Sequence, residues 1–259
     1  MAKLRPSRSS RAKPKQGSGP RFRGLSGPES GAPFRALVFD LDGTLVDSAP
    51  DIRTALNRTL AESDLKPVSL ASVRAMIGDG AETLVARGYR AHGVSLEGKA
   101  LAKRYARFID FYQGRGAAML TRPYPGVVAT LERLARAGFR LGLCTNKPAI
   151  ATEAVLAHLG LAHFFAATLS SDEVASHKPD PAHLRAVLAA LGVGPREAAM
   201  VGDNRHDVDM AHGAGVVAIA VAYGYAGGPP ADLGADLLIE RFDRLPAALK
   251  RLAARKPLP

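Results

Sequence analysis

A short apolar run that ends in two closely spaced carboxylates constrains the fold of this chain most. Residues 36–39 read Ala-Leu-Val-Phe and are followed by Asp40 and, after one residue, by Asp42. An unbroken apolar run predicts a strand buried on both faces, as in a parallel sheet. Residues two apart point to the same side of an extended chain, so both carboxylates can face one crevice. Ligands of open α/β sheets bind at this carboxyl end of the strands.

The two carboxylates have a second, simpler explanation. Asp42 and Gly43 after a strand are also a common turn signal. Like charges this close, however, require a cation or a shared proton. Mg²⁺ is a natural choice, because it takes oxygen ligands and completes its shell with water and substrate phosphate. The remainder of the chain decides between the turn and the metal site.

The pattern of an apolar run that ends in polar groups occurs again. Residues 140–144 lead into Thr145 and Asn146, residues 198–201 lead into Asp203, and Lys178 stands between them, before a proline. Each segment alone could be a helix cap, an extended loop or a turn. Together, and in this order, they predict polar groups at one edge of a doubly wound, mostly parallel Rossmann-like α/β sheet.

Residues 49–122 have a different pattern. Helical apolar spacing occurs at 52–62, 69–76, 81–91 and 96–112, and again at 127–137. We expect a helical cap domain at 49–122, inserted into an α/β catalytic core formed by 34–48 and 123–250, with the helix at 127–137 returning to the core. A flexible C-terminus is expected at 251–259. Such a cap can close over a site and select its substrate.

The expected cap offers three candidate substrate-binding residues. Gly80 ends a glycine-containing loop just before a predicted helix, where backbone amides can face an anion. Arg74 and Arg87 could bind a small carboxylate, although a lone helical arginine is more often a solvated side chain. Tyr223 and Tyr225 follow a strand-like segment, and we expect them to pack in the core.

Taken together, the motifs resemble those of the haloacid dehalogenase-like superfamily, which is built on a nucleophilic aspartate and consists mostly of phosphatases. The resemblance covers about residues 34 to 250, and residues 45–50, 77–81, 145–148 and 223–225 are most similar to the bacterial phosphoglycolate phosphatases. One departure is Asn204, where a small hydroxyl residue is more usual. The matched motifs are Asp40-Leu41-Asp42-Gly43-Thr44, Thr145-Asn146, Lys178, and Gly202-Asp203 with Asp207.

The chemistry of these residue types agrees with the roles that the resemblance implies. Asp40 would attack phosphorus and form an aspartyl-phosphate. Asp42 would protonate the leaving alkoxide and then deprotonate the hydrolytic water. Lys178 would supply positive charge to the nucleophile and to the transferring group.

The resemblance also implies binding roles. Mg²⁺ would be held by Asp40, the backbone carbonyl of Asp42 and Asp203, with Asp207 orienting ligands or a bound water. Phosphoryl oxygens would be held by Gly43, Thr145, Asn146 and Lys178. The cap candidates Gly80, Arg74 and Arg87, which come from the sequence pattern and not from the resemblance, would bind the rest of the substrate.

The function implied is Mg²⁺-dependent hydrolysis of 2-phosphoglycolate to glycolate and phosphate, with a small phosphorylated metabolite as the partner. Another small-molecule phosphatase, a pyrophosphatase or a phosphomutase would need the same two aspartates. A dehalogenase would have no use for an acid at Asp42. A different class of function is an inert domain whose basic tail binds a nucleic acid or a protein.

Composition agrees with a cytoplasmic enzyme, and we expect a monomer or a homodimer. The chain has 259 residues, 47% of them apolar, which suffices for a sizeable core. Its one cysteine, Cys144, cannot form an internal disulfide, which suits a reducing compartment. No apolar run reaches the roughly 18 residues of a membrane helix, so no membrane association is expected. The histidines show no zinc-binding spacing.

The basic charge of the chain is concentrated in its first 33 residues. Eight Lys or Arg residues against Glu29 leave +7 of the net +11 in this segment. It is rich in Ser, Gly and Pro, so we expect a disordered tail at 1–33. It could be a solvated extension, a weak polyanion-binding arm, an organelle transit peptide or a partner-binding segment. Specific nucleic-acid binding is not expected.

Overall fold

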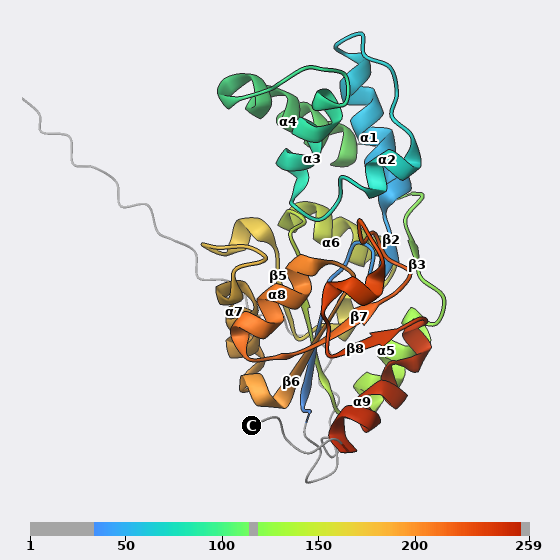
Figure 1. Ribbon diagram of the computed structural model, residues 1–259, viewed down its shortest axis with the longest axis vertical. Helices are drawn as coiled ribbons and strands as arrows, with labels where there is room; N and C mark the ends of the chain where they lie inside the picture. Colours follow the sequence, from blue (N-terminus) through green and yellow to red (C-terminus); the bar gives the residue numbers. More distant parts are fainter. Residues whose placement is uncertain (1–33, 114–118, 255–259) are drawn as a thin grey trace, which may run out of the picture.

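Six parallel strands form the central sheet of the computed structural model, which describes residues 34–113 and 119–254 (Figure 1). All neighbouring strands pair in parallel, and Phe39 lies beside both Leu143 and Val201. The predicted doubly wound α/β fold is therefore confirmed. In spatial order the strands are β5 (Ala167–Leu169), β4 (Arg140–Cys144), β1 (Ala36–Phe39), β6 (Ala198–Gly202), β7 (Val217–Val221) and β8 (Leu237–Ile239).

Helices cover both faces of the sheet because its buried strands alternate their side chains between two apolar layers. Leu37 and Phe39 point into the layer formed with α5 (Val127–Arg136), α6 (Ala149–His158) and α9 (Leu245–Ala254). Ala36 and Val38 point into the layer formed with α7 (Pro181–Leu191) and α8 (Arg205–Ala214). Single 3₁₀ turns complete the connections, at Ala162–Phe164, Ser171–Glu173, Pro195–Glu197, Pro230–Leu233 and Phe242–Arg244.

The direction of winding reverses at β1. From this strand the chain moves outward through β4 to β5, and later returns to the other side of β1 with β6, β7 and β8. The carboxyl ends of β1, β4 and β6 therefore meet at a topological switch point, where α/β sheets bind ligands.

Four helices form a separate unit above this edge of the sheet (Figure 1). They surround a separate apolar cluster that includes Leu56, Val85 and Phe108 and to which α6 contributes Ala151. Helices were predicted in each of these regions, and only their ends differ, by a few residues. We call the four helices the helical unit: α1 (Ala49–Ala61), α2 (Leu70–Arg74), α3 (Ala81–Arg90) and α4 (Gly98–Gln113).

Two chain segments join the helical unit to the sheet. They pair side by side as the antiparallel strands β2 (Val46–Asp47) and β3 (Arg122–Pro123). Near the start of α1, the buried carboxylate of Asp51 accepts hydrogen bonds from the backbone N–H of Leu120 (3.1 Å) and Thr121 (2.7 Å), and from the Thr121 hydroxyl. The outgoing and returning segments are thus tied together.

Two expectations concern the ends of the chain. Helix α9 continues to Ala254, beyond residue 251 where a flexible C-terminus was expected. Residues 255–259 and the basic tail at 1–33 lie outside the described residues. None of the described helices combines the length and the apolar character that crossing a bilayer requires.

Candidate active site

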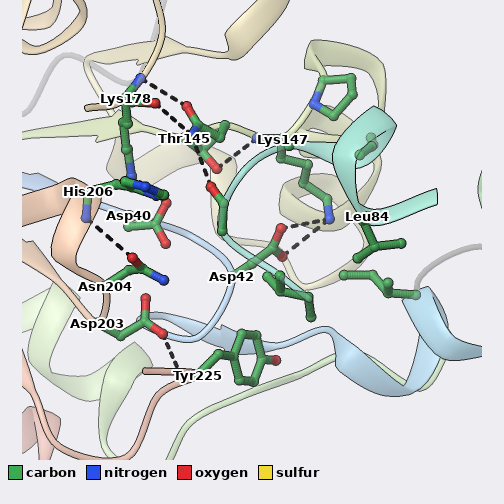
Figure 2. Close-up of a pocket in the computed structure, with 18 of the residues that line it drawn as sticks. Asp40, Asp42, Leu84, Thr145, Lys147, Lys178, Asp203, Asn204, His206 and Tyr225 are labelled. Atoms are coloured by element: carbon green, nitrogen blue, oxygen red, sulfur yellow. Dashed lines mark hydrogen bonds and ion pairs between the residues drawn. The ribbon is translucent and has the colours of Figure 1, made fainter. Parts of the chain in front are cut away.

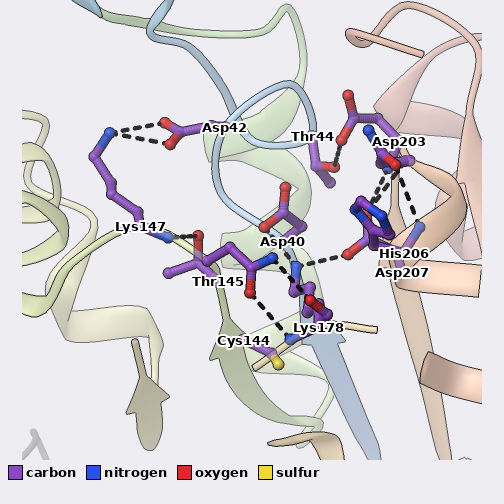
Figure 3. A network of polar contacts seen from close by, with 12 residues as sticks. Asp40, Asp42, Thr44, Cys144, Thr145, Lys147, Lys178, Asp203, His206 and Asp207 are labelled. Carbon is purple, nitrogen blue, oxygen red and sulfur yellow. Dashed lines mark hydrogen bonds and ion pairs between the residues drawn. The ribbon is translucent and has the colours of Figure 1, made fainter. Parts of the chain in front are cut away.

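Three buried carboxylates meet where β1 and β6 end (Figure 3). Asp40 directly follows β1, Asp203 directly follows β6, and Asp207 lies in the first turn of α8. One oxygen of each lies within 4.8 Å of the others. The parallel register brings the two strand ends to the same level, and the turn into α8 adds the third carboxylate.

Lys178 provides the positive charge in this cluster. Its buried ammonium donates to Asp40 Oδ1 at 2.7 Å and to Asp207 Oδ1 at 2.6 Å. Asn146 holds the lysine backbone, because its side chain accepts from Lys178 N–H at 3.1 Å and donates to the Lys178 carbonyl at 3.2 Å. Burial lowers the pKa of Lys178, but the charges of Asp207 and Asp40 outweigh it and raise that pKa above its ordinary value.

The cluster carries an excess of buried negative charge. Burial raises the pKa of Asp40 to about 7, against the opposing charge of Lys178. Burial and the nearby carboxylates of Asp40 and Asp207 raise the pKa of Asp203 as well. One ammonium cannot balance the charge of three carboxylates. All the atoms that these carboxylates offer to a metal are oxygens. The residues therefore fit a hard divalent cation, which prefers oxygen ligands and would offset the repulsion.

Asp203 is held in place on several sides. Its carboxylate accepts from Tyr225 N–H at 2.6 Å and from the Thr44 hydroxyl at 3.3 Å. A Cβ atom added at Gly43 or at Gly224 would lie only 2.2 Å from an Asp203 atom. Gly43, predicted to bind substrate, is not among the pocket-lining residues, and in this structure it leaves space for Asp203.

Asn204 and Asp207 shape the start of α8. The Asn204 side chain accepts from His206 N–H at 3.2 Å, and Asp207 Oδ2 accepts from the N–H groups of Asp203 and Asn204 at 3.2 Å each. These contacts form a capping box. The residue that departs from the motif is thus a helix cap, an interaction that asparagine makes as well as serine.

Asp42 lies on the other side of Asp40 and contacts a different lysine (Figure 2). Its carboxylate accepts from Lys147 Nζ at 3.0 and 3.2 Å and from the Ser48 hydroxyl at 2.6 Å. Lys147 Nζ also donates to the Tyr112 hydroxyl at 2.7 Å. Although burial opposes it, the charge of Asp42 raises the pKa of Lys147 above its ordinary value.

A cavity separates the sheet edge from the helical unit (Figure 2). Its polar side consists of the groups just described together with Thr145 and Asn146, and Gly80 of the helical unit also lines it. Asn146 donates from its amide to the Gly78 carbonyl at 3.0 Å, which joins the loop before α3 to the core. The opposite wall is apolar and includes Ile52, Ile77, Leu84, Phe108 and Ile109.

Arg74 and Arg87, the predicted carboxylate-binding residues, do not line this cavity. Arg74 instead pairs with Asp47 at 2.7 Å, and Arg87 pairs with Asp79 at 2.5 Å. Both arginines are bound to neighbouring carboxylates, so the structure does not bring them together with the other predicted site residues.

Tyr225 is buried, as the core-packing prediction requires, but it also lines the cavity. Its hydroxyl donates to Asp47 Oδ1 at 2.6 Å and accepts from Ser48 N–H at 2.9 Å. Tyr223 packs against the larger apolar layer and donates to the Thr44 carbonyl at 2.8 Å. Both tyrosines therefore pack in the core and brace the loop after β1.

Sequence reasoning missed three pocket-lining residues. Lys147 stood within a recognised motif without a role of its own, and Tyr112 looked like one more apolar position of a helix. His206 lies between the predicted metal-binding residues Asp203 and Asp207 but was given no role. His206 contacts Asp79 at 3.2 Å. The available signals were positions in the sequence: Lys147 follows Thr145 and Asn146 at the end of β4, and His206 precedes Asp207.

Comparison with known proteins agrees with this geometry. Residues 34–215 match the model of a protein family described as haloacid dehalogenase-like hydrolase. The chain belongs to this family. A relative from Rhodospirillum rubrum named phosphoglycolate phosphatase is 45% identical over 218 residues, covering 82% of this chain and 89% of the relative. A relative of the same name from Caulobacter vibrioides is 41% identical over 223 residues, covering 86% and 94%.

A solved structure has a fold similar to that of this haloacid dehalogenase-like hydrolase. It is described as a predicted phosphoglycolate phosphatase from Haemophilus somnus, with a TM-score of 0.78 and 30% sequence identity. The match covers 83% of this chain and 97% of the other. With its family and relatives, the chain is identified as a phosphoric monoester hydrolase.

Proposed function

We propose that this hydrolase is an Mg²⁺-dependent phosphatase that converts 2-phosphoglycolate into glycolate and phosphate through an aspartyl-phosphate. The observation that carries the proposal is Asp40, a buried carboxylate at the end of the central strand, paired with Lys178 at 2.7 Å and opening into the cavity. The relatives named phosphoglycolate phosphatase support the substrate.

Asp40 performs the first step. Its carboxylate oxygen forms a bond to phosphorus while the bond from phosphorus to the ester oxygen breaks, and the leaving oxygen takes the electron pair. Lys178 stabilises the charge of Asp40 and of the transferring phosphoryl group by a short, charge-assisted hydrogen bond. Thr145 and Asn146 line the cavity beside them, where their polar groups can hold phosphoryl oxygens.

Asp42 moves the protons. As an acid it protonates the leaving oxygen to release glycolate, and as a base it then takes a proton from the water that hydrolyses the aspartyl-phosphate. The water oxygen ends in inorganic phosphate, and Asp40 is regenerated. Asp42 suits this role because it lines the same cavity as Asp40 without being part of the three-carboxylate cluster.

Mg²⁺ would be held by Asp40, Asp203 and Asp207, with the backbone carbonyl of Asp42 as a further ligand that the family implies. When bound, it supplies positive charge that offsets the repulsion between the carboxylates and the substrate phosphate. We further propose that the helical unit acts as a cap, whose apolar wall excludes water from the aspartyl-phosphate.

A phosphate-release assay on the purified full chain tests the proposal. We expect hydrolysis of 2-phosphoglycolate that requires Mg²⁺, is lost on chelation, and is faster than hydrolysis of other small phosphate monoesters at equal concentration. A protein that releases phosphate from several monoesters but not from 2-phosphoglycolate would contradict the substrate, and one that is fully active after chelation would contradict the metal.

A further inference from the structure

Lys147 has a distinctive place among the charges of the cavity. In the described residues, the lining side chains that can carry positive charge are Lys147, Lys178 and His206. Lys178 is bound to two carboxylates of the buried cluster, and His206 faces Asp79 at the helical unit. Lys147 lies apart from both, and Asp42 is the one carboxylate it contacts among the described residues. It is therefore the cation that can bind the part of the substrate remote from the reacting phosphate.

The surroundings of Lys147 make its charge selective. The residue is 7% exposed, its ammonium lies 4.6 Å from the centre of the Tyr112 ring, and the Tyr112 hydroxyl is 2.7 Å away. Phe108 and Ile109 from the same helix extend the apolar wall. A buried ammonium of this kind must keep an anionic partner, because an unpaired charge is costly away from water.

We propose that Lys147 and Tyr112 bind the carboxylate of the substrate, which takes the place of Asp42 on the lysine. A substrate carboxylate enters, together with the phosphate, a cavity that already holds four carboxyl groups, those of Asp40, Asp42, Asp203 and Asp207. Exchange on Lys147 admits it without leaving the lysine unpaired. Arg74 and Arg87 cannot serve as readily, because both are bound to other carboxylates outside the cavity lining.

The exchange also affects the reaction. While Lys147 binds Asp42, the Asp42 carboxylate is turned toward the lysine (Figures 2 and 3). Once the substrate carboxylate takes its place, Asp42 keeps its hydrogen bond from Ser48 and can turn toward the leaving oxygen at Asp40. Lys147 is thus a specificity-determining and positioning residue. This selection presupposes the phosphatase function proposed above.

A comparison of two substrates tests the proposal on the full chain. Ethyl phosphate has the same phosphate ester as 2-phosphoglycolate but a methyl group in place of the carboxylate. The kcat and KM of both are measured for the wild type and for Lys147→Gln, Tyr112→Phe, Arg74→Gln and Arg87→Gln. The quantity of interest is the preference, defined as kcat/KM for 2-phosphoglycolate divided by kcat/KM for ethyl phosphate.

We expect Lys147→Gln to reduce the preference on the order of 100-fold, because one partner of a buried charge pair is removed. Tyr112→Phe should reduce it by roughly tenfold, the effect of one hydrogen bond to a charged group. In both variants kcat and KM for 2-phosphoglycolate should change together, since binding and the position of Asp42 are both affected. Arg74→Gln and Arg87→Gln should keep the wild-type preference.

Each other outcome overturns a defined part of the proposal. A high wild-type preference that Lys147→Gln retains, or an equal loss for both substrates, excludes carboxylate binding by Lys147 and leaves the phosphatase function standing. Loss of preference in either arginine variant assigns the carboxylate to that arginine. A wild-type preference near one refutes 2-phosphoglycolate as the substrate. If Lys147→Gln does not fold, Tyr112→Phe decides alone, and an unchanged preference there overturns the proposal.

Discussion

Asp40 and Asp42 are separated by a single residue in sequence but have different partners in space. Asp40 contacts Lys178 within the carboxylate cluster, whereas Asp42 contacts Lys147 and Ser48 outside it. A carboxylate that must attack phosphorus benefits from a fixed ammonium beside it, and one that must move protons benefits from exchangeable partners. The contacts of the two side chains thus agree with the proposed division between nucleophile and proton carrier.

Substitution of the two aspartates should have different consequences. Asp40→Asn should reduce turnover more than about 1000-fold and leave no phosphate on the chain, because the nucleophile is gone. Asp42→Asn should also reduce turnover, but with an aryl phosphate, whose leaving group needs no acid, it should accumulate the phosphorylated chain. Acid-quenched intact-mass spectrometry measures this directly. Ordinary turnover by pure Asp40→Asn would exclude the covalent intermediate.

The position of the Asp203 carboxylate should require a glycine at residue 43. It has a φ of +93°, and the Cβ of Gly43→Ala would lie 2.2 Å from Asp203 Oδ2. We expect activity to fall about 100-fold or more as Asp203 is displaced. Gly93→Ala is the matched control, since Gly93 has a φ of +74° but no atom within 4 Å of an added Cβ. In urea unfolding, Gly93→Ala should lose about 1 kcal/mol of stability to backbone strain, and Gly43→Ala should lose more because of the added clash with Asp203. Only Gly43→Ala should lose activity. Equal activity of the two would show that Asp203 tolerates the contact.

For individual residues, the sequence predicted the polar side chains that follow strands but not the side chains that meet across the cavity. Asp40 and Asp203 could be placed at one sheet edge because each ends an apolar run of a parallel strand. The contact of Lys147 with Tyr112 could not be predicted, because it depends on how α4 docks over the sheet. The helical positions of Arg74 and Arg87 are compatible with binding a ligand and with forming an ion pair, so the sequence could not decide between the two roles.

At the level of elements, apolar periodicity predicted the helices better than the shorter strands. Helix α3 begins at the expected Ala81, because an unbroken amphipathic pattern follows Gly80. Strands β5 and β8 have only three residues each and gave no separate signal. The pairing of β2 with β3 joins segments far apart in the chain, so it depends on the closed helical unit and not on local sequence.

Helix α7 is attached to the sheet edge by a buried histidine that makes the fold sensitive to acid. His183 Nε2 lies 3.1 Å from the Leu169 carbonyl of β5. Burial, and then the charge of Lys178, lower the pKa of His183 from 6.5 to about 4, with a smaller contribution from His177. Below pH 6.5 the unfolded chain therefore binds a proton that the folded chain does not accept until pH 4. Stability present above pH 6.5 is lost as pH falls through this window, by about 3 kcal/mol at most.

Urea unfolding of the wild type and of His183→Gln between pH 7 and 4 measures this contribution. The glutamine amide can keep the bond to Leu169 but does not titrate, so the variant should lose less stability than the wild type as pH falls. Asp40 and Asp203, whose pKa values are raised, act in the opposite direction in both proteins and cancel in the difference. His163→Gln, at an exposed position, is the control and should follow the wild type. Parallel curves for wild type and His183→Gln would contradict the assignment.

For the whole molecule, the proposed metal site at the buried carboxylate cluster would link metal binding to folding. A cation that binds Asp40, Asp203 and Asp207 only in the folded chain must stabilise it. Mg²⁺ at ten times its dissociation constant should add about 1.4 kcal/mol, which raises Tm by roughly 2–4 °C for a protein of this size. Asp207→Asn should reduce the shift, whereas Asp209→Asn, an exposed neighbour on α8, should retain it. Calorimetry with and without Mg²⁺ measures these shifts. A wild-type Tm that Mg²⁺ does not change would exclude the site.

The β2–β3 pair has a consequence for how such a protein can change. Because the chain leaves the core at Val46–Asp47 and returns beside it at Arg122–Pro123, the two ends of the insertion are neighbours in space. A short turn could close this gap without moving any strand of the sheet, since closing a short loop costs little entropy. We therefore expect the helical unit to be exchangeable. Recombination at these two points could give the same phosphate chemistry a new specificity while the core sequence stays as it is.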